Sequence, residues 1–135
     1  MTPDIGDALQ VFRFGPIDPR SMATWAGLLK DPNPIHLDVE AVKGMGLGDR
    51  RINQGPANLA YLINPVLQTF PGARFERIVN RFIGNVFEGD MIVATGTVTR
   101  VDPSTDGTRV TCDMVLEAVG RGAVVTGTIV VCLSC

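Results

Sequence analysis

The sequence has 135 residues, enough for one domain whose core needs neither disulfides nor a bound metal. Hydrophobic residues make up 45% of the chain and charged residues 19%, which is typical of a globular protein and excludes a disordered one. The net charge of -2 provides no basic surface for a phosphate backbone, so we expect no nucleic-acid binding. We interpret residues 1–135 as a single domain without internal repeats or linkers.

The cysteines and the apolar segments indicate a cytoplasmic protein. Cys112, Cys132 and Cys135 are odd in number and lack CxxC spacing, which disfavours both a disulfide framework and a zinc site. The first residues, MTPDIGD, lack the basic and apolar regions of a signal peptide. Residues 52–73 carry no charge, but polar residues, prolines and glycines interrupt them. A buried helix is therefore a better interpretation of this segment than a membrane span.

The first part of the chain predicts a strand followed by two helices. A strand-like run covers residues 9–14 and ends at a Gly-Pro pair. Asp18 then has the character of a helix N-cap with proline after it, and the helix that follows should end before Pro32. A second, short helix is predicted over residues 38–42, where glycines at positions 44, 46 and 48 close it.

The uncharged segment that begins at Gly55 is interpreted as one long helix. Its apolar residues recur at helical spacing and form a broad surface, made by Leu59, Leu62, Ile63, Val66, Leu67 and Phe70. Pro65 removes a backbone donor and should kink the helix near Tyr61. Because few polar residues interrupt this surface, other elements must enclose the helix.

From residue 74 onward the hydrophobic pattern has a period of two, which indicates consecutive strands. These predicted strands cover residues 75–83, 91–101, 108–119 and 123–133. In the third of them the even positions are apolar and the odd positions mostly polar, so one face of the sheet should be buried. The connections are short, and we expect a four-strand antiparallel meander. The fold class is thus α+β, with an antiparallel sheet wrapped around a long central helix.

The segment DPNPIHLD, residues 31–38, holds His36, the only histidine of the chain. One imidazole is too few for metal sites that need two or three, so we predict no metal centre. Covalent catalysis is disfavoured as well, because no serine lies in a G-x-S-x-G turn and two cysteines fall in strand-like patterns. Asp31 and His36 remain as a carboxylate and imidazole pair suited to general acid-base catalysis.

Two prolines suggest how this pair could meet. Pro32 and Pro34 exclude a regular helix and bias Asp31 and Asn33 toward extended backbone. A rigid bend could then bring Asp31 and His36 over one water molecule or one substrate atom. The alternative is structural: Asp31 would cap the end of a helix, Asn33 would make a turn, and His36 would be an ordinary surface or core residue.

The motif DPNPIHLD resembles the hydratase motif of the MaoC-like family, which includes (R)-specific enoyl-CoA hydratases. The similarity continues through INQGPANLAYL and NRFIGNVFEGDMIVATGTVTRV and covers about residues 5–101. The resemblance implies a hot-dog fold, in agreement with the helix and sheet predicted above. It also implies a hydro-lyase that adds water to the double bond of a trans-2-enoyl-CoA thioester, or eliminates it, with a (3R)-hydroxyacyl-CoA product.

By this resemblance, Asp31 and His36 match the catalytic pair that holds and activates the water. Gly55 matches the glycine that opens the central helix, and its backbone N–H would stabilise the thioester oxygen. Asn33 would orient the catalytic loop. No cofactor is implied, because coenzyme A enters as part of the substrate.

The substrate-binding residues that we expect in addition to Asn33 are Gln54, Asn58 and Tyr61. Gln54 departs from the family pattern, since many relatives have histidine there, and a small hydroxyl residue often found further along the helix is replaced by Leu62-Ile63. These departures concern the shape of the pocket and the acyl group. The candidates for contacts with the coenzyme A phosphates are Arg50, Arg51, Arg74, Arg77 and Arg81.

A single hot-dog chain leaves sheet edges and apolar surface uncovered, so we expect a homodimer or a higher homo-oligomer, with a hetero-oligomer as the alternative. Two other functions stay open. One is an acyl-CoA thioesterase of the same fold, which the lack of acidic residues in residues 56–70 disfavours. The other is a non-catalytic acyl-CoA-binding or partner subunit of a hetero-oligomeric hydratase.

Overall fold

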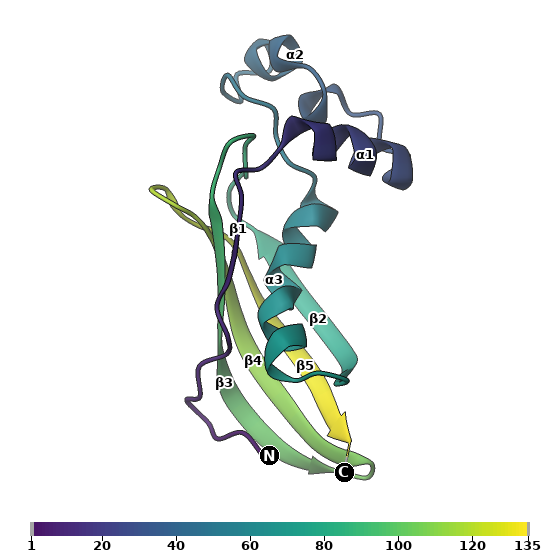
Figure 1. Cartoon of the computed structure of the whole chain (residues 1–135), viewed down its shortest axis with the longest axis vertical. Coiled ribbons are helices and arrows are strands. Elements are labelled where there is room, and N and C mark those ends of the chain that lie inside the picture. Colours follow the sequence, from purple (N-terminus) through teal and green to yellow (C-terminus); the bar gives the residue numbers. More distant parts are fainter. Residues whose placement is uncertain (1, 135) are drawn as a thin grey trace.

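The computed structural model describes residues 2–134, and Cys135 therefore lies outside the described residues. A curved antiparallel sheet of five strands wraps one side of a long helix, α3, and the remaining helices gather beyond the N-terminal end of α3 (Figure 1). The elements in chain order are β1 (Phe12–Phe14), α1 (Pro19–Leu29), the 3-10 helix η1 (Pro34–His36), α2 (Val39–Gly44), α3 (Gly55–Thr69), β2 (Arg74–Phe82), β3 (Ile92–Ser104), β4 (Gly107–Ala118) and β5 (Gly122–Ser134). The predicted α+β class is confirmed.

The helices begin and end close to the predicted positions because the sequence contains recognisable capping residues. Asp18 is the N-cap of α1 and its carboxylate accepts a hydrogen bond from the backbone of Arg20. Asp38 caps α2 in the same way. The first strand is shorter than predicted: only its last three residues pair with β3, and Ala8 and Leu9 contact β3 through an isolated bridge and a single backbone bond.

The predicted four-strand meander is wrong. The order of strands in the sheet is β1-β3-β4-β5-β2, so β2 pairs with β5 and not with β3. Residues 83–91 consequently cross the sheet from β2 at one edge to β3, the neighbour of β1 at the other edge. Alternation in the sequence defines which face of a strand is buried, but it does not define which strand lies beside it. We call residues 83–91 the crossover segment.

The core lies between α3 and the concave face of the sheet. Leu62 and Val66 of α3 are fully buried against the even positions of β4, which confirms the predicted buried face of that strand. Pro65 lies within α3, and the helix continues to Thr69. The neighbouring Asn64 donates a side-chain hydrogen bond of 2.7 Å to the carbonyl of Ala60.

No helix within residues 2–134 has both the length and the hydropathy needed to cross a membrane.

The packing of α3 on β5 gives a stability prediction for a pair of glycines. A Cβ atom on Gly127 would lie 2.8 Å from the carbonyl oxygen of Val79 and 3.2 Å from a methyl of Leu62, whereas one on Gly27 in α1 would contact nothing. Gly127→Ala should therefore lower the free energy of unfolding by about 1–3 kcal/mol. Gly27→Ala should raise it by about 0.5–1 kcal/mol. Urea denaturation checks both values, and equal stability of the two variants would contradict this packing.

Candidate active site

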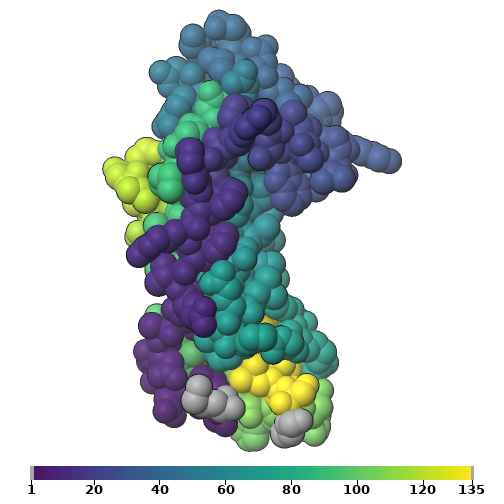
Figure 2. Space-filling view, viewed as in Figure 1, coloured from purple at the N-terminus to yellow at the C-terminus, as the bar shows by residue number. Residues whose placement is uncertain are grey.

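The candidate site lies where the α1–η1–α2 layer meets the N-terminal end of α3 (Figure 1). In the space-filling view this layer overhangs the rest of the molecule and leaves a concave outline beside α3 (Figure 2). α1 is followed by its C-cap, Lys30, which adopts the left-handed conformation with φ 51°, and the backbone N–H of Asp31 then donates to the carbonyl of Ala26 at 3.0 Å. This bend directs the chain into the proline-rich segment that carries the dyad.

The predicted pair does meet in space. Nε2 of His36 lies 3.2 Å from Oδ2 of Asp31. The other carboxylate oxygen, Oδ1, accepts a hydrogen bond of 3.1 Å from the backbone N–H of Asn33, whose own side chain accepts from Ile35 at 3.3 Å. Pro34 is tolerated at the first position of η1, so the segment forms one helical turn that closes the distance between residues five apart. Asn33 thus links the Asp31 carboxylate to the start of η1 through these two hydrogen bonds.

One hydrogen bond fixes the orientation of the imidazole. Nδ1 of His36 lies 2.6 Å from the carbonyl oxygen of Ile52. A carbonyl can only accept, so Nδ1 carries a proton and Nε2 is the nitrogen presented to Asp31.

The two members of the dyad differ in their access to solvent. The side chain of His36 is 8% exposed, whereas that of Asp31 is 33% exposed. A water molecule or a substrate can therefore reach the carboxylate while the ring stays fixed in its packing. An open hollow beside the ring is lined by Pro19, Arg20, Ala23, His36, Leu37 and Arg51.

Ile52 joins the dyad to the start of α3. Its N–H donates to the carbonyl of Ile35 at 3.0 Å while its own carbonyl accepts from His36. Gly55, the first residue of α3, follows three residues later. The position of His36 relative to the end of α3 is thus set by backbone hydrogen bonds, which sequence reasoning could not find because any residue supplies them.

Gly55 presents a free backbone donor. Within residues 2–134 its N–H has no hydrogen-bond acceptor, and Pro56 has no N–H. The N-terminal end of a helix carries partial positive charge, which favours an anionic oxygen. A Cβ atom on Gly55 would lie 3.2 Å from the ring of Phe82 in β2, a tight contact that a small shift of this exposed ring would have to relieve.

Gln54 and Asn58, both predicted to bind substrate, are buried and make internal hydrogen bonds. Gln54 donates to the carbonyl of Met22 at 2.8 Å and so ties α1 to the start of α3. Asn58 accepts a bond of 2.8 Å from the side chain of Asn53, a buried residue that our sequence interpretation did not select. Oε1 of Gln54 and Oδ1 of Asn53 have no partner within the described part of the chain.

Tyr61, the fourth predicted substrate contact, packs on the β1 side of α3. Its ring centroid lies 6.5 Å from that of Phe12 and 5.3 Å from that of Phe14. Burial raises the pKa of the Tyr61 hydroxyl, and the side chain of Asn53 acts in the opposite direction.

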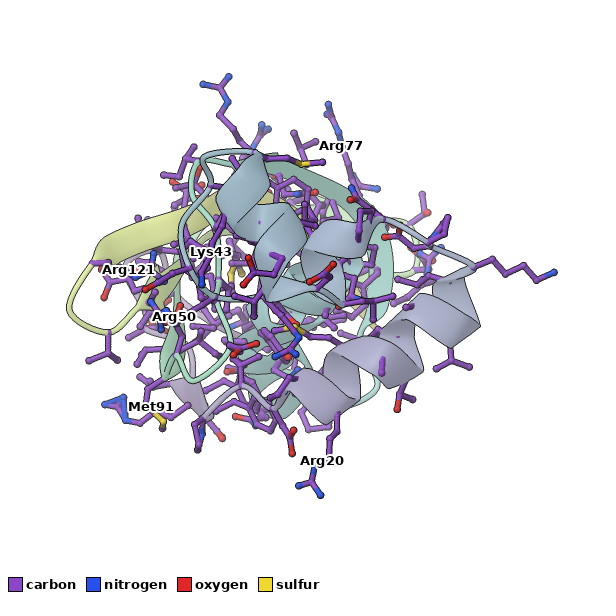
Figure 3. The ribbon with its side chains drawn as sticks, turned by 90° about the horizontal axis from the view of Figure 1, so that it is seen from above. Arg20, Lys43, Arg50, Arg77, Met91 and Arg121 are labelled. Carbon is purple, nitrogen blue, oxygen red and sulfur yellow. The ribbon has the colours of Figure 1, made fainter. Side chains whose placement is uncertain are left out.

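The arginines proposed for phosphate contacts separate into two groups. Arg50 binds Asp90 and Arg51 binds Glu88, while Arg74 pairs with Glu76 and Asp106. Arg77 and Arg81 are exposed on β2 and make no ion pair within residues 2–134. Seen from above, Arg77 points away from the molecule on the side opposite Arg50 and Arg121 (Figure 3).

No cluster of three or more His, Cys, Asp or Glu side chains with a metal-binding arrangement occurs between residues 2 and 134. The expected absence of a metal centre stays a prediction. The thiol of Cys112 is buried in the core, and burial raises its pKa to about 11. This cysteine is therefore a poor nucleophile, in line with the expectation that catalysis is not covalent.

Comparison with known proteins identifies the family. The sequence profile described as MaoC like domain matches residues 4–119, and the chain belongs to this family. The fold is the hot-dog fold, as the resemblance predicted. No curated protein sequence matches the chain.

Several solved structures share this fold. The (R)-hydratase from A. caviae involved in PHA biosynthesis superimposes with a TM-score of 0.85 at 23% identity, over 97% of each chain. The R-hydratase PhaJ1 from Pseudomonas aeruginosa gives 0.84 at 21% identity, over 98% of this chain and 83% of the other. The ChsH1-ChsH2 complex from Mycobacterium tuberculosis gives 0.82 at 19% identity, over 96% of this chain and 98% of the other.

Tyr61 is the only tyrosine, so its titration can be followed by absorbance. We expect a midpoint above the ordinary pKa of 10.0, because burial favours the neutral hydroxyl in the folded chain. As the pH rises past the ordinary value, the unfolded chain loses this proton before the folded chain does, and the stability should fall. Tyr61→Phe should weaken that dependence. A midpoint at or below the ordinary value would contradict the burial of the hydroxyl.

Proposed function

We propose that the protein is a hydro-lyase that adds water to trans-2-enoyl-CoA thioesters, or eliminates it, and that its product of hydration is a (3R)-hydroxyacyl-CoA. The observation that carries the proposal is the 3.2 Å contact between Nε2 of His36 and the part-exposed carboxylate of Asp31. Membership of the MaoC-like family supports the same reaction class. The two named (R)-hydratases with this fold agree with it.

In the proposed reaction, the dyad holds a water molecule and removes one of its protons. The water oxygen forms a bond to C3 of the enoyl group, and the electron pair of the double bond moves toward the thioester. The enolate oxygen that develops is stabilised by the free N–H of Gly55 at the positive end of α3. The dyad then returns a proton to C2. The net result is the addition of H and OH to one face of the double bond.

The pattern of charges disfavours the thioesterase alternative. α3 runs from Gly55 to Thr69 without any Asp or Glu, so it offers no carboxylate to activate water at the thioester carbon. The acidic residue nearest to the imidazole is Asp31, which is held by the turn at Asn33. This arrangement suits proton transfer to and from a water that Asp31 and His36 hold together.

We also infer that a second hot-dog chain completes the site. β2 is an edge strand with exposed apolar residues, among them Ile78, Val79 and Phe82. Phe82 contacts the region of Gly55, so a partner on this edge would border the end of α3. We prefer a partner that is a second copy of this chain. The alternative is a different hot-dog chain, for which the ChsH1-ChsH2 complex is a precedent. Arg77 and Arg81 are then the best placed to meet coenzyme A phosphates.

The central activity prediction concerns the dyad. Asp31→Asn and His36→Ala should each lower the turnover of hydration by about 10²–10⁴-fold, because each removes a proton-transfer group. The assay follows the loss of enoyl absorbance on a series of enoyl-CoA thioesters. Asp38→Asn is a matched control, since this carboxylate in the same segment only caps α2.

Wild-type turnover in either dyad variant would refute the assigned roles. Release of free thiol without loss of the double bond would instead support a thioesterase.

A substitution on the β2 edge tests the proposed dimer. Val79→Asp should shift the mass measured by light scattering toward that of one chain and lower the activity with it, because a charge is placed in the proposed interface. Val119→Asp is the control, since Val119 is equally apolar and 62% exposed but lies at the β4–β5 turn. Full activity of a wild-type chain that is monomeric at every concentration would contradict a shared site.

A further inference from the structure

We propose that Arg51 is a positioning residue for His36, acting through a guanidinium bridge to Glu88 and Leu37. The inference rests on the proposed function, because it assigns to Arg51 and Glu88 the task of holding the imidazole in its catalytic orientation. Neither residue touches the dyad directly in the hydrogen bonds described for residues 2–134.

The bridge consists of two contacts of the Arg51 side chain and two of its backbone. Nε of Arg51 donates to the carbonyl of Leu37 at 3.1 Å, and Nη1 donates to Glu88 at 2.8 Å. The backbone N–H of Arg51 also reaches the Glu88 carboxylate at 3.3 Å, and the N–H of Glu88 returns a bond of 2.9 Å to the carbonyl of Arg51. Arg51 therefore joins the segment after His36 to the crossover segment.

The position of this bridge explains how it orients the imidazole of His36. Leu37 follows His36 in the chain and Ile52 follows Arg51, and the ring of His36 bonds to the carbonyl of Ile52 at 2.6 Å. The bond from Arg51 to Leu37 and the bond from His36 to Ile52 thus join the same two short segments, residues 36–37 and 51–52. Without the two side-chain contacts, Leu37 keeps the bond from its N–H to Pro34, but its carbonyl is no longer tied to the crossover segment. The backbone next to His36 can then turn, and the ring turns with it.

The crossover segment gives the bridge a rigid support. Asp90, buried at 8% exposure, binds both Arg50 and Arg121 and accepts a hydrogen bond from the backbone of Phe87. The ring of Phe87 lies 5.0 Å from the guanidinium of Arg50 and 4.9 Å from that of Arg121. Arg50 and Arg121 lie beside each other when the molecule is seen from above (Figure 3). Glu88 lies between Phe87 and Asp90 in the chain, and the contacts of these two residues hold the segment in place.

The chemistry requires arginine at this position. The two donors Nε and Nη1 belong to one planar group, so they bind Leu37 and Glu88 at once and at fixed angles. Lysine would keep the positive charge and the ion pair with Glu88, but its single ammonium group cannot make both contacts in the same geometry. Arg51→Lys therefore removes the positioning while it retains the charge.

The test compares Arg51→Lys with Arg109→Lys. Arg109 pairs with Glu76 on the sheet, and the two ion pairs have similar burial, with side-chain exposures of 32% and 23% for Arg51 and Glu88 against 43% and 21% for Arg109 and Glu76. Arg51→Lys should lower kcat about tenfold to a hundredfold with KM changed less than about twofold, because the reacting groups are misplaced. Arg109→Lys should change neither constant.

The single histidine provides a readout that needs no substrate. In protein with nitrogen-15 in its histidine, the Nδ1 proton of His36 should give a resolved NMR signal, since it is buried and bonded to Ile52. This signal should shift or broaden in Arg51→Lys and stay unchanged in Arg109→Lys. If Arg51→Lys does not fold, Glu88→Gln provides the same comparison against Glu76→Gln.

A folded Arg51→Lys variant with wild-type kcat and a wild-type imidazole signal would overturn the inference, as would an equal change in Arg109→Lys. A wild-type protein that hydrates no enoyl-CoA would refute the proposed function alone. The imidazole signal would still decide whether Arg51 positions the ring.

Discussion

The hydrogen bond between the His36 ring and the Ile52 carbonyl is the interaction on which the candidate site depends. At 2.6 Å it holds the ring, decides which nitrogen carries the fixed proton, and leaves the other nitrogen to face Asp31. It also connects two parts of the chain that are distant in sequence, the proline bend and the approach to α3. A catalytic pair on a loop needs such an anchor, because an untethered loop would lose its geometry to thermal motion.

The crossover segment is what keeps that anchor in place. Residues 51–53 run beside residues 86–88, with bonds from Asn53 to Val86 and from Glu88 to Arg51 and a bridge between Ile52 and Phe87. The same segment carries Asp90 and its two arginines. In a simple meander a hairpin would join β2 to β3. Here the crossover segment joins them and supports the site. The fold therefore uses the connection between β2 and β3 to fix the end of α3 and the histidine together.

Much of this architecture could be predicted from the sequence, because its signals are local. Pro32 and Pro34 restrict the backbone between Asp31 and His36 so narrowly that their meeting could be expected. The caps of α1 and α2 and the alternation in β4 are equally local. The rest depends on contacts between distant segments. The pairing of β2 with β5 and the partners of Gln54 and Arg51 leave no pattern in the sequence near those residues.

The central claim is that Asp31 and His36 act together on one water molecule opposite the N–H of Gly55. The most direct measurement is a crystal structure of the protein with a bound, unreactive analogue of an enoyl-CoA thioester. The account predicts an ordered water within hydrogen-bonding distance of both the Asp31 carboxylate and Nε2 of His36, with the thioester oxygen accepting from the Gly55 N–H. An analogue whose thioester lies away from both groups would contradict it.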